Sequence, residues 1–131
     1  MSKVLIVDDS STMRRIIGNV VQQLGIKKDD FETLQQEVKD IHIDDELSKY
    51  ILKIVFATRE PQNYDLEEII QYIDFGVSPR GSIDLYKACK ARAYLNGKSF
   101  VTPYDVAQVA FLVLRHRIIL NYTATANDIT A

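Results

Sequence analysis

Residues 73–120 read IDFGVSPRGSIDLYKACKARAYLNGKSFVTPYDVAQVAFLVLRHRIIL, and this stretch decides the fold class. It contains two helix starts, Ser78 and Thr102, each a good N-cap residue followed at once by a proline. Asp105 stands three residues after the second cap, the spacing of a capping box. Gly97 follows the last apolar position of the first helix. The stretch therefore predicts two successive helices, the second running to about residue 117.

Most of the chain between the N-terminal segment and this stretch also favours helices. His42–Ile43 and Phe100–Val101 read as extended and can pair as a very small sheet. The chain becomes more polar after Ile118, which predicts a frayed tail. We therefore predict a mainly α fold, a helical bundle with at most a very small β-sheet. The further predicted helices cover residues 31–39, residues from Asp44 or Asp45 to just before Pro61, and residues 66–72.

The N-terminal segment has a different pattern. Residues 3–8, KVLIVD, form a continuous apolar run that is typical of a strand buried on both faces. Ser10 or Ser11 can cap a following helix, and Gly25 ends it. The chain thus opens with a β-strand–helix element whose strand has no obvious sister strand. We expect the strand to join the small sheet, to pair with a second copy or to stay loose, and an exposed apolar edge favours self-association.

Composition and charge limit the classes of function. The net charge of −2 gives no general reason to bind nucleic acid, and no apolar run reaches the length of a membrane span. The sequence shows no signal peptide and a single cysteine, which favours a cytoplasmic protein without disulfides. Residues 1–28 carry five basic and two acidic residues, whereas residues 29–131 carry eleven basic and sixteen acidic ones. We expect a helical domain over 29–131, preceded by a segment, 1–28, that is not an independent domain.

The N-terminal segment resembles a known family. VLIVDDSSTMRRII, residues 4–17, is similar to the first strand and helix of CheY-like response-regulator receivers, and the resemblance covers about residues 3–26. It implies that Asp8 and Asp9 help to hold Mg²⁺; the alternative is a pair of solvated turn acids. No later strand ends in a phospho-acceptor aspartate, and no Lys-Pro dipeptide follows. The receiver's phosphotransfer activity is therefore not expected.

The remainder resembles another family. Residues 30–122 are similar to the C-terminal lid of MoxR-type AAA+ ATPases, which implies an AAA+ lid-like helical bundle. In that family the lid works with an ATPase core and neighbouring subunits, which are the partners the resemblance implies. The motifs that carry it, in order, are ATRE (57–60), G-x-SPR (76–80), VTPxDV (101–106) and LRHR (114–117).

The resemblance assigns a role to Arg80. In AAA+ proteins the arginine of the G-x-SPR motif is the sensor-2 arginine, which reaches from the lid toward the phosphates of the nucleotide. A guanidinium is permanently charged and offers a planar set of donors to phosphate oxygens. From the residues alone, a solvated arginine after a proline is the simpler interpretation.

Catalysis is not expected from these 131 residues, and neither catalytic residues nor cofactors are predicted. They contain no G-x-x-x-x-G-K-[ST] loop, and the Gly97-Lys98-Ser99 imitation has Arg92 in place of the first glycine. His42 and His116 lack neighbours at zinc-ligand spacing, and Cys89 lies on an apolar helix face.

These patterns together predict a chimera of an incomplete receiver and an incomplete AAA+ ATPase, either a natural gene fusion or an engineered protein. We expect no autonomous catalytic function. The alternative is a nucleotide-responsive adaptor or regulatory module that acts in trans with an AAA+ ATPase.

Overall fold

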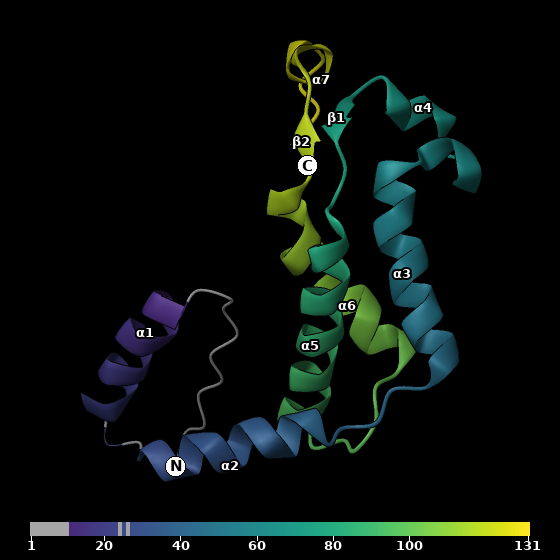
Figure 1. Ribbon diagram of the computed structural model, residues 1–131. Helices are drawn as coiled ribbons and strands as arrows, with labels where there is room; N and C mark the ends of the chain where they lie inside the picture. The colour runs from purple at the N-terminus through teal and green to yellow at the C-terminus, as the bar shows by residue number, and fades with distance from the viewer. Residues whose placement is uncertain (1–10, 24, 26) are drawn as a thin grey trace.

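The computed structural model describes residues 11–23, 25 and 27–131, and it is mainly helical. Figure 1 shows α3, α5 and α6 as an upright body, with α2 running across its lower end and α1 standing apart from it. The predicted helical bundle is confirmed. The elements in chain order are α1 (Ser11–Gln23), α2 (Lys28–Lys39), α3 (Asp45–Arg59), the 3-10 helix η1 (Pro61–Tyr64), α4 (Glu67–Ile70), β1 (Ile73–Phe75), α5 (Pro79–Leu95), α6 (Pro103–Leu114), the 3-10 helix η2 (Arg115–Arg117), β2 (Ile119–Leu120) and α7 (Tyr122–Ala126).

The core of the body is built from apolar residues spaced three or four apart. This spacing puts side chains on one face of a helix, and the buried faces of α3, α5 and α6 meet one another. α5 lies at the centre and packs against α6, α3 and α2. The central buried residues are Leu47, Ile51 and Val55 of α3, Leu85, Cys89 and Ala93 of α5, and Val106 and Val109 of α6.

The predicted helix ends agree with the structure where a cap or a proline defines them. α5 begins at Pro79 after Ser78 and ends at Leu95, and Gly97 follows with a φ of +71°. The left-handed φ is a backbone conformation that glycine adopts without strain. The predicted long helix is α3, and the predicted helix over 31–39 begins earlier, at Lys28.

The sheet is only partly as predicted. His42 and Phe100 form a parallel bridge, which confirms that these two extended pieces meet. The two-stranded sheet lies elsewhere, between β1 and β2, which pair antiparallel with Ile73 opposite Leu120. Both strands are two or three residues long. They are too short to show an alternating pattern in the sequence.

The prediction of a frayed tail is wrong for the residues that follow β2. The Asn121 side chain caps α7 by accepting a hydrogen bond from the Ala124 N–H (3.0 Å), and its amide donates to the Gln71 carbonyl (2.6 Å). Ala124 is fully buried, and its carbonyl accepts a hydrogen bond from Ile129. A capping side chain with a second partner thus anchors the tail to the segment before β1.

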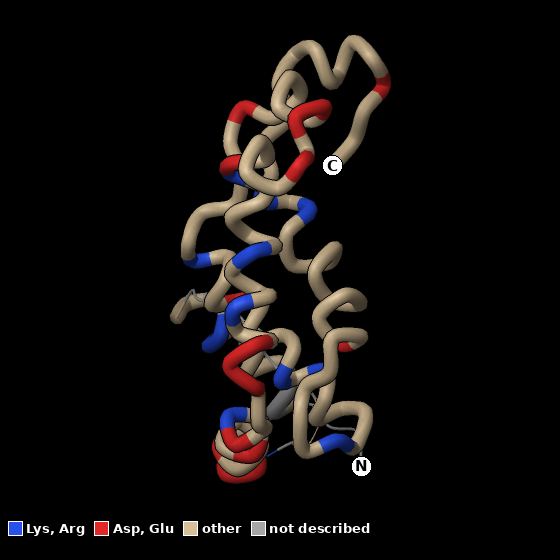
Figure 2. Tube along the Cα trace, turned by 90° about the vertical axis from the view of Figure 1, so that its right-hand side faces the viewer, with Lys and Arg blue, Asp and Glu red and all other residues tan. Residues whose placement is uncertain are grey.

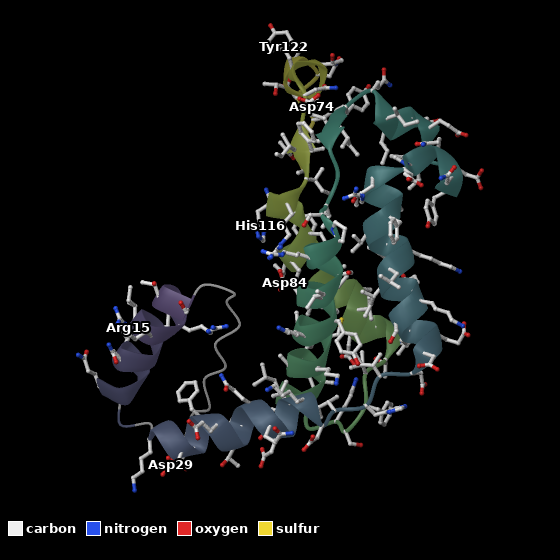
Figure 3. The ribbon with its side chains drawn as sticks, viewed as in Figure 1. Arg15, Asp29, Asp74, Asp84, His116 and Tyr122 are labelled. Carbon is white, nitrogen blue, oxygen red and sulfur yellow. The ribbon has the colours of Figure 1, made fainter. Side chains whose placement is uncertain are left out.

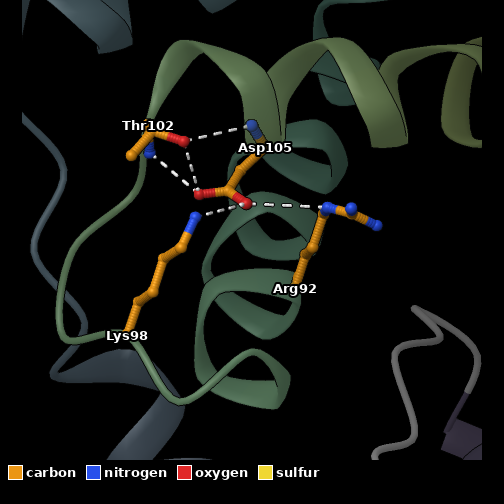
Figure 4. A network of polar contacts seen from close by, with 4 residues as sticks. All are labelled: Arg92, Lys98, Thr102 and Asp105. Carbon is orange, nitrogen blue, oxygen red and sulfur yellow. Dashed lines mark hydrogen bonds and ion pairs between the residues drawn. The ribbon is translucent and has the colours of Figure 1, made fainter.

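The α5–α6 connection is fastened by a buried carboxylate, Asp105 (Figure 4). Its Oδ2 accepts hydrogen bonds from the backbone N–H and the hydroxyl of Thr102, both at 2.9 Å, which completes the predicted capping box. Its Oδ1 lies 3.5 Å from Arg92 Nε and 3.6 Å from Lys98 Nζ. One side chain therefore ties the start of α6 to the last turn of α5 and to the loop that joins them.

The surroundings of Asp105 favour its charged form. Burial by itself raises the pKa of this carboxyl, but the hydrogen bonds from Thr102 and the charges of Lys98 and Arg92 outweigh burial and hold the pKa below its ordinary value. A carboxyl with a lower pKa in the folded state stabilises the fold above its unfolded-state pKa. That stability is lost as the pH falls through the folded-state pKa.

We expect Asp105→Asn to lower the free energy of unfolding at neutral pH by about 2 kcal/mol, because the charged acceptor of several hydrogen bonds is lost. The variant should also lose less stability than the native protein between about pH 4 and pH 2. Urea denaturation followed by circular dichroism over this pH range measures both effects. Equal acid sensitivity of the two proteins would contradict the assignment of the charge to Asp105.

Candidate functional site

Arg80 occupies the second position of α5, directly after the proline that begins the helix. Its side chain is exposed, and the structure shows no hydrogen bond or ion pair for it within residues 27–131. The first turn of α5 contains no acidic residue. The guanidinium therefore lies at the positive end of the helix dipole, where an anion is stabilised.

The end of α3 holds the segment that leads into α5. The Thr58 hydroxyl donates to the Val55 carbonyl (2.7 Å) and accepts a hydrogen bond from the Val77 backbone N–H (2.9 Å). The guanidinium of Arg59 donates to the Val77 carbonyl (3.4 Å). Both backbone polar groups of Val77, itself fully buried, are thus satisfied by α3. The bond between Thr58 and Val77 thus joins the ATRE motif to the G-x-SPR motif across 19 residues of sequence.

Gly76 allows this close approach. A Cβ at this position would collide with the Thr58 carbonyl and lie 2.8 Å from the Arg59 Cα, so the neighbours that would have to move are backbone atoms. The backbone of Gly76 therefore lies against the last turn of α3 in a space that no larger residue fits.

The second turn of α5 is joined to the end of α6. The Arg117 guanidinium pairs with Asp84 at 2.7 Å and also donates to the Val113 carbonyl at 3.1 Å. Figure 3 labels Asp84 of α5 and His116, the residue before Arg117 in η2. Arg117 of the LRHR motif thus serves as a link between helices. Asp84, the nearest acid after Arg80 along α5, is engaged by this pair and does not neutralise Arg80.

Figure 2 shows Asp and Glu residues gathered mainly at the two ends of the body, and Lys and Arg residues mainly along the stretch between them. The arrangement can contact a phosphate group from one side. It offers a single exposed guanidinium and the N-terminal end of a long helix, held on a braced backbone.

Other residues that the sequence singled out have structural surroundings. Burial, and after it the charge of Asp105, raises the pKa of the Cys89 thiol to about 12, so the reactive thiolate is suppressed. Lys98 of the P-loop imitation lies beside Asp105. His42 Nε2 is 2.7 Å from the Asp44 carboxylate on the surface.

The predicted divalent-cation site at Asp8 and Asp9 lies outside the described residues and stays a prediction. Among residues 11–23, 25 and 27–131, no group of three or more His, Cys, Asp or Glu side chains is arranged to hold a metal ion. Within the same ranges, no helix has both the length and the apolar character needed to cross a bilayer.

Comparison with known families decides the nature of the helical body. Residues 68–131, which include α5, α6 and the β1–β2 sheet, match the AAA lid domain. The helical body has the fold of an AAA lid domain. Arg80, Asp84, Asp105 and Arg117 all lie within the matched part of this lid domain.

The relatives of this chain include two MoxR proteins. The chain is 35% identical over 101 residues to "Chaperone MoxR1" of Mycobacterium tuberculosis, covering 77% of this chain and 27% of the relative. It is 40% identical over 106 residues to the uncharacterized protein YeaC of Bacillus subtilis, covering 81% and 30%. It is also 36% identical over 84 residues to Protein MoxR of Paracoccus denitrificans, covering 61% and 25%.

A solved structure agrees with these matches. The crystal structure of an ATPase candidate from Cytophaga hutchinsonii superposes with a TM-score of 0.71 at 44% identity, over 72% of this chain and 29% of that one. The chain spans between a quarter and a third of the length of these relatives. The predicted resemblance to the MoxR lid is therefore confirmed, and none of these comparisons shows a receiver segment.

The sequence singled out Arg80 as a candidate, which stays a prediction, but it did not indicate the contacts that hold the segment before α5. Thr58 lies within ATRE, yet nothing in the local sequence indicates that its hydroxyl accepts a hydrogen bond from a residue on another element. The same holds for the pairing of Asp84 with Arg117, which joins α5 to η2. Both contacts connect elements far apart in sequence, and spacing within one helix does not predict them.

We expect Gly76→Ala to lower the free energy of unfolding by about 1–3 kcal/mol, because backbone atoms of α3 would have to move. Gly18→Ala on α1 is the matched control, since a Cβ there meets nothing within 4 Å. The control should leave the stability of the body unchanged. Thermal denaturation compares the two variants, and equal melting temperatures would contradict the close packing of Gly76.

Proposed function

We propose that this chain acts as a non-catalytic lid module, in which Arg80 contacts the phosphates of a nucleotide held by an AAA+ ATPase core. The observation that carries the proposal is the exposed, unengaged guanidinium of Arg80 at the start of α5 in a lid-domain fold. The 131 residues contain no phosphate-binding loop of their own. In this proposal the core binds the nucleotide and supplies the chemistry, and the lid supplies one cationic contact.

The chemistry of the site supports a contact with phosphate. A guanidinium keeps its charge at any physiological pH and can donate two parallel hydrogen bonds to phosphate oxygens. The partial positive charge of the α5 N-terminus acts in the same direction. The Ser78 side chain makes no capping hydrogen bond with this turn, so it does not satisfy the first-turn donors of α5.

A titration of the chain with ATP, followed by amide NMR, tests the proposal. We expect shifts to cluster at residues 77–82 and the dissociation constant to weaken roughly tenfold or more in Arg80→Ala, since one charge-assisted contact is lost. Arg80→Lys should recover part of the affinity, because it keeps the charge but not the planar fork.

Arg15→Ala is the matched control for charge. Arg15 is an exposed arginine on α1, which stands apart from the body (Figure 3). Its loss should leave the ATP response at residues 77–82 unchanged. A chain that does not respond to ATP, or a response that Arg80→Ala does not weaken, would overturn the proposal in favour of an Arg80 that no longer acts.

We propose in addition that residues 3–26 are a receiver-derived strand and helix joined to the lid, and that the strand drives self-association. The resemblance to receivers supports this, and so does α1, a helix over the predicted residues that is followed by Gly25 with a φ of +87°. Within the described residues the sheet has only two strands, so it can accept another along an edge.

Size-exclusion chromatography with light scattering tests self-association. We expect the native chain to approach the mass of a dimer as its concentration rises, and Ile6→Asp, which places a charge in the apolar run, to remain a monomer. Val20→Asp on α1 is the control, because Val20 is exposed and lies outside the predicted strand. A native chain that stays monomeric at all concentrations would refute this part of the proposal.

A further inference from the structure

We infer that Thr58 is a positioning residue for Arg80: its hydroxyl fixes the backbone before α5 so that the first turn presents the guanidinium to phosphate. This inference rests on the proposed function. It assigns a role to Thr58 of the ATRE motif, which lies in the last turn of α3.

The Thr58 hydroxyl is fully engaged in two directions. It donates its single proton to the Val55 carbonyl at 2.7 Å, which leaves a lone pair for the Val77 N–H at 2.9 Å. Only a side chain that both donates and accepts at one atom meets this requirement, so serine can replace threonine here and valine cannot. The site is partly buried, where an unpaired N–H is costly.

Two further contacts restrict the same segment. Arg59 holds the Val77 carbonyl, and Gly76 lies directly against the Thr58 carbonyl. The Val77 side chain is fully buried, and it faces Gly81 of α5. The segment is thus fixed by its backbone on the α3 side and by its side chain on the α5 side.

The fixed segment leads to Arg80 with little freedom in between. Ser78 is the N-cap of α5, and its carbonyl accepts a hydrogen bond from the Gly81 N–H at 2.8 Å. The backbone φ of Pro79 is fixed by its ring. Arg80 is therefore three residues beyond the Thr58 contact, across a cap, a proline and a hydrogen-bonded turn. Without the hydroxyl, the Val77 N–H loses its hydrogen-bond partner. The first turn of α5, which carries Arg80, is then no longer held in one orientation.

Thr58→Val and Thr58→Ser form the test pair, because valine keeps the shape of threonine and serine keeps its hydroxyl. In Thr58→Val we expect the dissociation constant for ATP to rise roughly three- to tenfold. Hydrogen exchange at the Val77 amide should become roughly tenfold faster or more. Thr58→Ser should restore both values toward those of the native chain.

Ile51→Val controls for a general loss of stability. Ile51 is a core residue of α3, two turns before Thr58, and its shortening lowers the melting temperature without removing the hydroxyl. It should leave the ATP affinity and the Val77 exchange rate unchanged. If Thr58→Val does not fold, Thr58→Ala removes the same two hydrogen bonds with less bulk at the site and is measured in its place.

The outcomes separate this inference from the proposed function. If the native chain responds to ATP through Arg80 but Thr58→Val changes only the melting temperature, the positioning role is overturned and the proposed function stands. A Thr58→Ser variant as weak as Thr58→Val also overturns the role, since the hydroxyl would then not be responsible. If Arg80→Ala leaves the ATP response unchanged, the proposed function fails and the positioning role fails with it.

Discussion

The buried carboxylate of Asp105 is the constraint on which the arrangement of the helical body depends. It completes the cap of α6, and it also holds Arg92 at the end of α5 and Lys98 in the connecting loop. A buried charge is tolerated only when it is paired and hydrogen-bonded, so α6 can begin here in one geometry. Once this hairpin is set, the four-residue spacing on α5 fixes which face α3 covers. The position of the α5 N-terminus, and of Arg80, follows from that packing.

The motifs that identify the lid are mainly joints between its elements. VTPxDV contributes Asp105, which joins the start of α6 to Lys98 of the α5–α6 loop, and LRHR contributes Arg117 to the pair with Asp84. ATRE contributes Thr58, whose hydroxyl accepts a hydrogen bond from the Val77 N–H of the G-x-SPR motif. Arg80 differs from these residues because its side chain is exposed and has no partner in the described part of the body. Of these four motif residues, Arg80 is therefore the one whose side chain is available to bind a ligand.

The sequence predicted those features that are determined locally. Caps, prolines and the glycine after α5 determine helix ends within a few residues, and they agree with the structure at Pro79 and Pro103. The β1–β2 sheet was not predicted, because strands of two or three residues carry no periodic signal. The ordered tail was missed because Asn121 both caps α7 and bonds to Gln71, 50 residues away. At the candidate site, Arg80 was singled out through its motif and stays a prediction, whereas the bond between the Thr58 hydroxyl and the Val77 N–H joins residues 19 apart and follows from no local pattern.

In the proposed function, the energy of a single phosphate contact explains why the lid would act together with a core. One charge-assisted hydrogen bond contributes about 1.5–3 kcal/mol, whereas millimolar binding alone requires about 4 kcal/mol. Ordering the arginine side chain costs up to about 2 kcal/mol of rotamer entropy, which reduces the gain further. The hydrogen bond from the Val77 N–H to Thr58 adds no contact with the nucleotide. It lowers the entropy cost of binding, because the first turn of α5 is already ordered before the phosphate arrives. In the proposed function, an isolated lid therefore binds ATP weakly, at millimolar or higher concentrations that an NMR titration still reaches, and Arg80 has its full effect when a core has already bound the nucleotide.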